Sequence, residues 1–416
     1  LLRLRRRARN TATATSNGAA SSLPSSRLPQ PPAGLLLDCG EGSLGQLTRA
    51  FGCEEGLAAV RSLELIWVSH IHADHHAGLP RLLMARARAV AEMEEKRGKE
   101  GAKEGAGAGA AEAGASNAFS PPSVIPILGP RPLRRVLAAY EHVCGGPGSL
   151  RYEFFDNGDV SAAVAEGEAE ASAAAGKGSS SHLLSSPSSS LLPPLVSRAM
   201  SRLGLGKLVP VRVFHCAHSF GLIVEQEREV GGEAAGGEAE GGGKAAENSK
   251  APPPIPPIKL SFSGDTRRCP ALELAASGSH LLVHEATFED GLEGEALAKN
   301  HSTTSDAVLT GRGARAAATL LTHFSQRYPK VPAVDTVVGV GDGDENDEEE
   351  NKKEKKNLNP LRSSSNVGVA FDLLKVDVVD AATLLPALTG PLRRLFDALE
   401  GGGGDGGGGG EEEEGS

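Results

Sequence analysis

The sequence predicts an α/β protein in which short buried strands alternate with helices, and in which a site is assembled at strand ends. Short aliphatic runs recur along the chain, for example Leu63–Val68, Leu281–Val283 and Thr319–Thr322. Several of these runs are followed at once by a histidine, as at His284 and His323. Polar side chains at strand ends converge easily on one point, so this pattern favours a site at the edge of a sheet.

Length alone overstates the folded part of the chain. A chain of 416 residues would suggest two or three domains, but its 53 glycines are concentrated in low-complexity runs. We therefore expect one domain over 34–399, a disordered or truncated N-terminal segment over 1–33, and a disordered tail over 400–416. The expected low-complexity inserts lie near 91–118, 157–206, 226–257 and 333–364. The formal charge of −10 comes in part from these segments.

The elements between the inserts follow from hydrophobic runs and their spacing. The expected strands are 34–37, 63–68, 124–130, 208–214, 221–225, 258–263, 281–283 and 319–322. The expected helices are 43–50, 133–143, 305–318 and one that starts near Pro80. Apolar residues alternate again over 367–399.

The cysteines and the apolar runs indicate in which kind of cellular compartment the protein works. The chain has five cysteines at spacings that suit neither a disulfide framework nor a zinc finger, so we expect core thiols in a reducing compartment. No apolar run approaches the roughly 18 residues of a membrane span, so we expect neither membrane insertion nor secretion.

The densest chemical signal is His70-x-His72-x-Asp74-His75, between an expected strand and an expected helix. Imidazole nitrogens and a carboxylate are zinc-type ligands. Four such groups exceed what one tetrahedral ion with an open position needs, so the spacing suggests two ions that share a site. The alternative is a loop of solvated histidines. Asp38 either orients a metal-binding histidine or serves as a helix N-terminal acid.

Seven motifs in a fixed order resemble the metallo-β-lactamase superfamily and, within it, the ribonuclease Z family. The similarity is nearest to the C-terminal half of the long eukaryotic form. The motifs are Leu37–Gly42, Ser69–His76, His218–Gly221, Ser263–Thr266, His284–Thr287, His301–Thr304 and His323–Tyr328. The resemblance implies an αββα sandwich. The low-complexity inserts have no counterpart in the family.

The resemblance also implies a set of metal ligands for two zinc ions, for which Mn²⁺ or another divalent ion can substitute. One zinc would be held by His70, His72 and His218, the other by Asp74, His75 and His323, with Asp265 bridging both. His215 is an alternative to His218. We prefer His218 because the family places its ligand directly before the Ser-Phe-Gly turn.

The catalytic roles follow from the same resemblance. Asp74 would accept the proton of the attacking water and aim it, and His301 would protonate the leaving 3′-oxygen. Glu285 could orient a histidine. His76 and His284 are interpreted as structural residues. Thr303 and Thr304 are candidates for contact with the RNA end, and a helix cap at Thr304 or Ser305 is the alternative.

The implied function is a zinc-dependent endoribonuclease that removes the 3′ trailer from precursor tRNA. The alternatives are a related hydrolase of small phosphodiesters or thioesters, and a non-catalytic tRNA-binding module. The N-terminal half of the long forms, or a second subunit, could be needed to grip the tRNA. The nucleus, the mitochondrion or both are the expected compartments, with the plastid also possible.

The start of the chain departs from the family. Arg9–Thr13 resembles the end of the family's Pro-x-Lys-x-Arg-Asn stretch, but the proline and lysine are not in place. The strand that precedes this stretch in the family is missing. We therefore expect a truncated N-terminus and a first sheet that lacks an edge partner.

Overall fold

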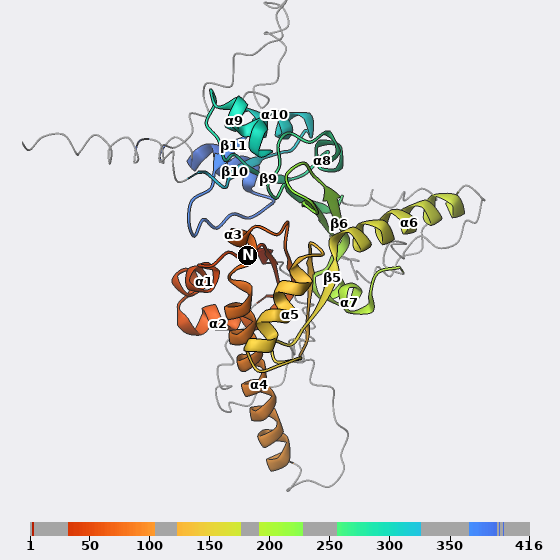
Figure 1. Cartoon of the computed structure of the whole chain (residues 1–416), viewed down its shortest axis with the longest axis vertical. Coiled ribbons are helices and arrows are strands. Elements are labelled where there is room, and N and C mark those ends of the chain that lie inside the picture. Colours follow the sequence, from red (N-terminus) through yellow and green to blue (C-terminus); the bar gives the residue numbers. More distant parts are fainter. Residues whose placement is uncertain are drawn as a thin grey trace, which may run out of the picture. The chain divides into compact units, whose positions relative to one another are not determined.

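The computed structural model describes residues 2–3, 32–104, 123–175, 191–227, 256–325, 366–388, 391 and 394. The chain divides into two compact units, Leu1–Lys259 and Leu260–Ser416. Figure 1 shows the elements of both units, coloured along the sequence. No helix among the described residues is long and apolar enough to cross a membrane.

Unit 1 contains a five-stranded sheet in the order β1-β2-β3-β4-β5. Its strands are β1 (Leu2–Arg3), β2 (Gly34–Leu37), β3 (Leu63–Trp67), β4 (Ile125–Gly129) and β5 (Tyr152–Asp156). The pairs from β2 to β5 are parallel, so the loops that follow these strands leave from the same edge of the sheet. The expected lack of an edge partner is wrong, because β1 pairs antiparallel with β2.

One face of this sheet is covered by α1 (Ser43–Phe51), α2 (Cys53–Arg61), α4 (Leu79–Glu104) and α5 (Leu133–Val143). Side chains from these helices share one buried cluster with the strand residues Ile66 and Ile127. Helix α5 has the predicted bounds, and its Leu133 and Leu137 lie one turn apart on the buried side. Side chains alternate across a strand, so Leu65 and Trp67, also fully buried, face the opposite side.

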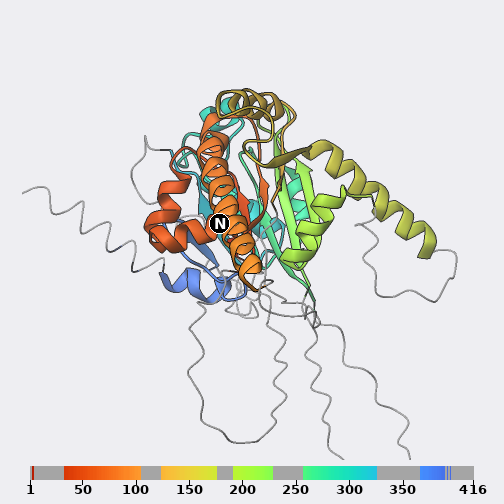
Figure 2. The ribbon, with the colours of Figure 1, turned by 90° about the horizontal axis from the view of Figure 1, so that it is seen from below.

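Two of the predicted inserts are partly helical, which corrects their extent. Helix α4 continues to Glu104, and α6 (Asn157–Ala175) and α7 (Pro194–Leu203) lie within 157–206. Helix α6 extends outward as a single rod (Figures 1 and 2). The remainder of these inserts, most of the other two and the tail lie outside the described residues.

Helix α7 follows a pattern that composition alone concealed. Val196, Ala199, Met200 and Leu203 recur at helical spacing and are all buried. Gly204 then ends the helix with a left-handed φ of 69°, a conformation that glycine adopts without steric cost. The serine-rich segment before α7 hid this amphipathic stretch from a compositional reading.

The remaining strands of unit 1 form a hairpin that carries the second histidine loop. Strands β6 (Leu205–Arg212) and β7 (Phe220–Gln226) pair antiparallel. Helix α7 contacts β3, β4 and β6. The backbone N–H of Phe220 donates to the carbonyl of Ser69 at 3.1 Å. This bond holds the loop between β6 and β7 beside the loop that follows β3.

Unit 2 has parallel strands in the order β11-β10-β9-β8. They are β8 (Ile258–Phe262), β9 (Leu281–Glu285), β10 (Thr319–Thr322) and β11 (Val367–Val369). The helices are α8 (Pro270–Ala275), α9 (Glu293–Lys299) and α10 (Thr304–Gly313). Ala307 and Val308 of α10 pack against Leu321 and Val367. Residues 381–388 are also helical, and most residues beyond them lie outside the described part.

Candidate metal centre

Three imidazoles of unit 1 converge on one point. Nε2 of His70 lies 2.9 Å from Nδ1 of His72, and Nε2 of His215 lies 3.0 Å from the same atom. The three histidines can each offer a ligand atom within 4.8 Å of the others. The lone pairs of neutral imidazoles repel at this distance unless a proton or a cation lies between them. This donor set therefore fits a zinc-type ion.

The structure departs from the sequence prediction at the next ligand, because it brings His215 rather than His218 to the pair. No candidate metal group within the described ranges contains His218. His218 has a left-handed φ of 62°, and the hydroxyl of Ser219 accepts a hydrogen bond from the N–H of Cys216 at 3.1 Å. This turn directs His215 towards His72. The distance in sequence from Ser-Phe-Gly does not predict which histidine faces His72, because the conformation of the loop determines it.

Asp38 holds the histidine loop from the neighbouring strand. Its Oδ1 accepts from the backbone N–H of Ser69 at 2.7 Å, and its Oδ2 accepts from the Ser69 hydroxyl at 2.9 Å. The same Oδ2 lies 2.8 Å from Nδ1 of His75. Of the two readings of Asp38, the geometry agrees with the one in which it orients a histidine.

The bonds of Asp38 determine which nitrogen of His70 carries the proton. The hydroxyl of Ser69 has one hydrogen, which it donates to Asp38, so the 2.9 Å contact with Nδ1 of His70 requires an N–H there. The lone pair of His70 is then on Nε2, the atom that faces His72. A metal ligand of this type commonly has its other nitrogen fixed in this way.

Two glycines let the loops that carry these residues pack closely. The N–H of Cys39 donates to the carbonyl of His75 at 2.7 Å, and the N–H of Gly78 donates to the carbonyl of Cys39 at 2.9 Å. A Cβ on Gly40 would overlap the carbonyl oxygen of Asp74, and one on Gly78 would overlap Gly40. Only glycine allows this approach.

These contacts fix the short helix α3 (Ala73–His76), which carries Asp74 and His75. Oδ2 of Asp74 lies 3.4 Å from Nε2 of His75, and the Asp74 side chain is 65% exposed. His76 is buried, with Nε2 3.0 Å from the carbonyl of Ile71. The contact of His76 agrees with its interpretation as a structural residue.

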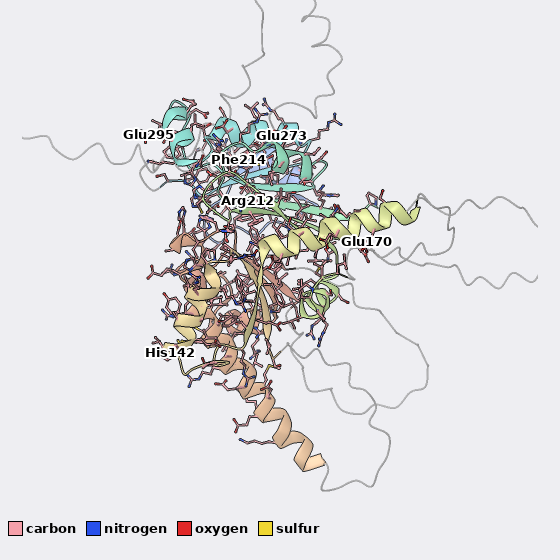
Figure 3. All side chains as sticks on the ribbon, turned by 45° about the vertical axis from the view of Figure 1, so that its right-hand side comes forward. His142, Glu170, Arg212, Phe214, Glu273 and Glu295 are labelled. Atoms are coloured by element: carbon pink, nitrogen blue, oxygen red, sulfur yellow. The ribbon has the colours of Figure 1, made fainter. Side chains whose placement is uncertain are left out.

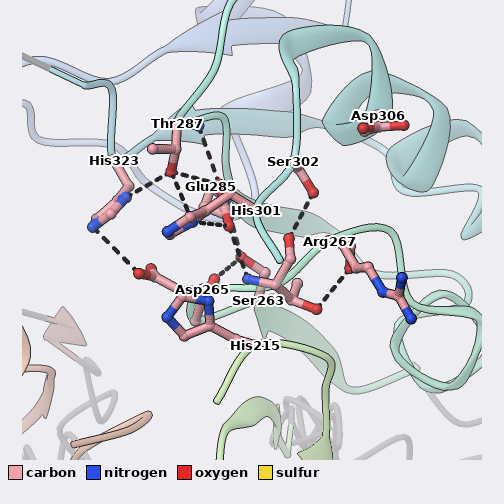
Figure 4. A network of polar contacts seen from close by, with 12 residues as sticks. His215, Ser263, Asp265, Arg267, Glu285, Thr287, His301, Ser302, Asp306 and His323 are labelled. Atoms are coloured by element: carbon pink, nitrogen blue, oxygen red, sulfur yellow. Dashed lines mark hydrogen bonds and ion pairs between the residues drawn. The ribbon is translucent and has the colours of Figure 1, made fainter. Parts of the chain in front are cut away.

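In unit 2, a second network is built around Glu285, at the end of β9 (Figure 4). The Glu285 side chain is 1% exposed, and its Oε1 lies 2.8 Å from Nδ1 of His301. Oε1 also accepts from the N–H of Thr266 at 2.8 Å, and Oε2 accepts from the hydroxyl of Thr287 at 2.6 Å. The sequence prediction that Glu285 orients a histidine is compatible with these contacts.

The same threonine links Glu285 to His323. The hydroxyl of Thr287 donates to Glu285, so its 2.9 Å contact with Nδ1 of His323 requires an N–H on that nitrogen. The lone pair of His323 is then on Nε2, which lies 3.5 Å from Oδ2 of the buried Asp265. The rings of His301 and His323 stack with centroids 5.9 Å apart. Glu285, His301 and His323 form a second candidate metal group.

Two other predicted residues have structural contacts. His284 is fully buried, its Nδ1 lies 2.7 Å from the carbonyl of Glu285, and burial lowers its pKa. Thr303 is the N-cap of α10 and forms a reciprocal capping box with Asp306. The helix cap therefore lies at Thr303, just before the predicted positions Thr304 and Ser305.

The cysteines are all free, in agreement with the expected lack of a disulfide framework. Cys39 lies beside the histidine loop, but burial raises its thiol pKa to about 12. A thiol with such a pKa is protonated near neutral pH and is a weak nucleophile. Cys39 is therefore a core thiol rather than a reactive one.

Comparison with solved structures assigns the fold. A long form RNase Z from yeast matches with a TM-score of 0.53 and 20% sequence identity, over 88% of this chain and 38% of the yeast chain. Together with the clustered histidines of the loop after β3, this match defines a protein of the metallo-β-lactamase fold. The predicted fold class is confirmed. No protein-family model matches the chain.

Sequence relatives narrow the class to one family. A mitochondrial tRNase Z of Arabidopsis thaliana is 37% identical over 324 residues, which cover 72% of this chain and 29% of that protein. The human zinc phosphodiesterase ELAC protein 2 is 31% identical over 366 residues, which cover 88% and 32%. The chain belongs to the ribonuclease Z, or tRNase Z, family. It spans less than a third of the length of these two relatives.

Proposed function

We propose that this chain carries the catalytic site of a zinc-dependent endoribonuclease that removes the 3′ trailer from precursor tRNA. The single observation that supports this most strongly is the convergence of His70, His72 and His215 on one point. The names of the relatives, which specify tRNase Z and a zinc phosphodiesterase, supply the substrate class and the metal.

The proposed ligand set retains the predicted residues with one change. The ligands are His70, His72, Asp74, His75, Asp265 and His323, with His215 in place of His218. The count of two zinc ions rests on the size of this set. Zinc held by these residues would supply a Lewis acid for phosphodiester hydrolysis and positive charge opposite the phosphate.

Three side chains of this protein carry out or support the proton transfers. Asp74, with its exposed carboxylate, orients the attacking water and accepts its proton. His301, as an imidazolium with Nδ1–H directed at Glu285, donates the proton on Nε2 to the leaving 3′-oxygen and becomes neutral. Glu285 is a positioning residue, because its bond to Nδ1 of His301 holds the ring and leaves Nε2 to face the substrate.

Two of the relatives are named as mitochondrial tRNase Z proteins, so the proposed compartment of this chain is the mitochondrion. The proposed partner is precursor tRNA. The chain spans less than a third of its relatives, so a further segment or subunit could add to the grip on the tRNA.

The direct test is incubation of the zinc- or manganese-loaded chain with an end-labelled precursor tRNA and mapping of the cut. We expect cleavage just after the discriminator nucleotide. Elemental analysis should find two zinc ions per chain, and a value of none or one would exclude the two-ion site. Cleavage of bis(p-nitrophenyl) phosphate without cleavage of RNA would indicate the small-diester hydrolase. RNA binding without any cleavage would indicate the binding module.

A further inference from the structure

The N-terminal half of α5 carries a cluster of arginines that the proposed chemistry does not use. Arg131 lies just before the helix, and Arg134 and Arg135 lie in its first turn. All three are exposed. At 100° per residue, Arg131 and Arg135 point away from the buried face formed by Leu133 and Leu137, and Arg134 flanks them. The cluster is thus a compact positive patch on a chain with a net charge of −10.

Sheet register places this cluster at the same edge as the histidine loop of unit 1. Strands β3 and β4 are parallel neighbours, and Trp67 is paired with Leu128 at their ends. The N–H of Val68 donates to the carbonyl of Leu128 at 2.8 Å, which extends the pairing past the last registered residues. His70 is three residues beyond Trp67, and Arg131 is three residues beyond Leu128. Neighbouring strands lie about 4.8 Å apart.

The three arginines of the cluster differ in whether they form ion pairs. Arg131 has Nη2 3.3 Å from Oδ1 of Asp159 and Nε 3.9 Å from Oδ2 of Asp156. Neither Arg134 nor Arg135 makes an ion pair with another residue of the described ranges. Desolvating these two guanidinium groups against an anion would therefore break no existing pair. Next along the exposed face, Ala138 and Ala139 are small, so an approaching ligand meets little steric obstruction.

Figure 3 shows the extent of this helix, with His142 labelled at the end opposite the arginines. The charge is thus confined to the end of α5 that leaves the sheet beside the histidine loop. The positive end of the helix dipole lies at the same end and adds to the potential. A phosphodiester held at the histidines would bring the adjoining phosphates of its strand within reach of these arginines.

We propose that Arg134 and Arg135, with Arg131 anchored beside them, bind backbone phosphates of the RNA substrate and position it for cleavage. The inference rests on the proposed function for its substrate class. Guanidinium groups bind phosphate oxygens in a bidentate manner without reading the base, so this contact positions the strand and carries no sequence preference.

The test compares the zinc-loaded full chain with the double variant Arg134→Ala/Arg135→Ala. We expect affinity for precursor tRNA, measured by filter binding at about 0.1 M salt, to fall about tenfold or more. The slope of log K against log salt should become shallower by about 1.4 to 1.8, for two lost phosphate contacts. In cleavage assays the loss should appear mainly in KM rather than in kcat.

The matched control is Arg88→Ala/Arg312→Ala, which removes two exposed arginines from α4 and α10. We expect it to keep the affinity and the salt slope of the unaltered chain. Circular dichroism and zinc content report whether each variant is folded. A folded, zinc-loaded Arg134/Arg135 variant with unchanged affinity and slope would overturn the inference, and so would an equal loss in the control.

The two proposals can fail separately. If the unaltered chain binds the precursor but leaves it uncut, the proposed function is wrong, and the binding data still decide the role of the arginines. If the unaltered chain cuts the precursor correctly and the double variant does so with the same KM, the proposed function stands and the role of the arginines is wrong.

Discussion

The two units contain hydrogen-bond networks of the same design around different histidines. In unit 1 a carboxylate, Asp38, lies 2.8 Å from one imidazole Nδ1, and a hydroxyl, Ser69, links it to the Nδ1 of His70. In unit 2 the carboxylate of Glu285 lies 2.8 Å from the Nδ1 of His301, and the hydroxyl of Thr287 links it to His323. Each carboxylate therefore sets the orientation and tautomer of two rings.

The networks differ in what surrounds the oriented rings. In unit 1, Nδ1 of His72 lies within 3.0 Å of Nε2 of both His70 and His215, so three imidazole nitrogens meet at one point. In unit 2 the carboxylate itself is buried and receives two backbone N–H groups, from Thr266 and Thr287. The first arrangement suits a cation, and the second fixes the ring of His301 as well as that of the proposed ligand His323. The same local chemistry thus serves two tasks.

The largest expected effect follows from removing an imidazole of the crowded cluster. His72→Ala should lower trailer cleavage at least about a thousandfold, since the metal supplies several kcal/mol of charge stabilisation. Zinc content, measured by elemental analysis, should fall in parallel. His218→Ala is the matched control and should keep its zinc, whereas His215→Ala should lose it. The opposite result would restore His218 as the ligand.

A smaller effect is expected from the carboxylate of unit 1. Asp38→Asn keeps the size of the side chain but replaces one accepting oxygen with an amide nitrogen, which cannot accept from Nδ1 of His75 or the Ser69 hydroxyl. Zinc affinity should fall by up to about a hundredfold, as is typical when a ligand loses its orienting acid. Competition with a chromogenic chelator measures it. Unchanged affinity would mean that Asp38 only holds the loop.

The carboxylate of unit 2 should behave differently. Glu285→Gln should lower kcat by about ten- to a hundredfold, because the uncharged amide no longer balances the positive charge that His301 carries when it acts as the proton donor. Zinc content should stay near that of the unaltered chain, since the hydroxyl of Thr287 remains beside His323. Loss of zinc from this variant would remove the distinction between the two networks.

The smallest effect is expected from the hydroxyl link of unit 2. Thr287→Val has nearly the same shape but cannot bond to Glu285 and His323, and one hydrogen bond to a charged group contributes about 1.5 kcal/mol or more. We expect a drop in kcat of about tenfold. Thr287→Ser should restore most of the activity, because it returns the hydroxyl. Failure of the serine variant to do so would point to packing of the methyl group instead.

Much of the site could be predicted from the sequence because its signals are local. His70-x-His72-x-Asp74-His75 follows a strand whose apolar residues are contiguous, and β10 and α5 have bounds set by runs that end abruptly. Strand residues alternate and helix residues repeat at 3.6, so such patterns specify both the element and its buried side without knowledge of the rest of the chain.

Other elements of the fold could not be predicted from local sequence patterns. Helix α7 was hidden because its four apolar positions follow a serine-rich stretch whose composition resembles a linker. Strand β1 is only two residues long and is stabilised by pairing with β2 across a wide gap in sequence. Contacts between distant segments decide both, and composition carries no record of them.

The sequence by itself determined the family, the fold class and most of the candidate ligands, because these depend on residue types at short spacings. Only the tertiary structure decided that His215 faces His72, that Asp38 bonds to His75, and that Arg134 and Arg135 leave the same sheet edge as the histidine loop. The physical reason is that a loop's backbone conformation and the register between strands set side-chain direction. Both depend on partners far along the chain.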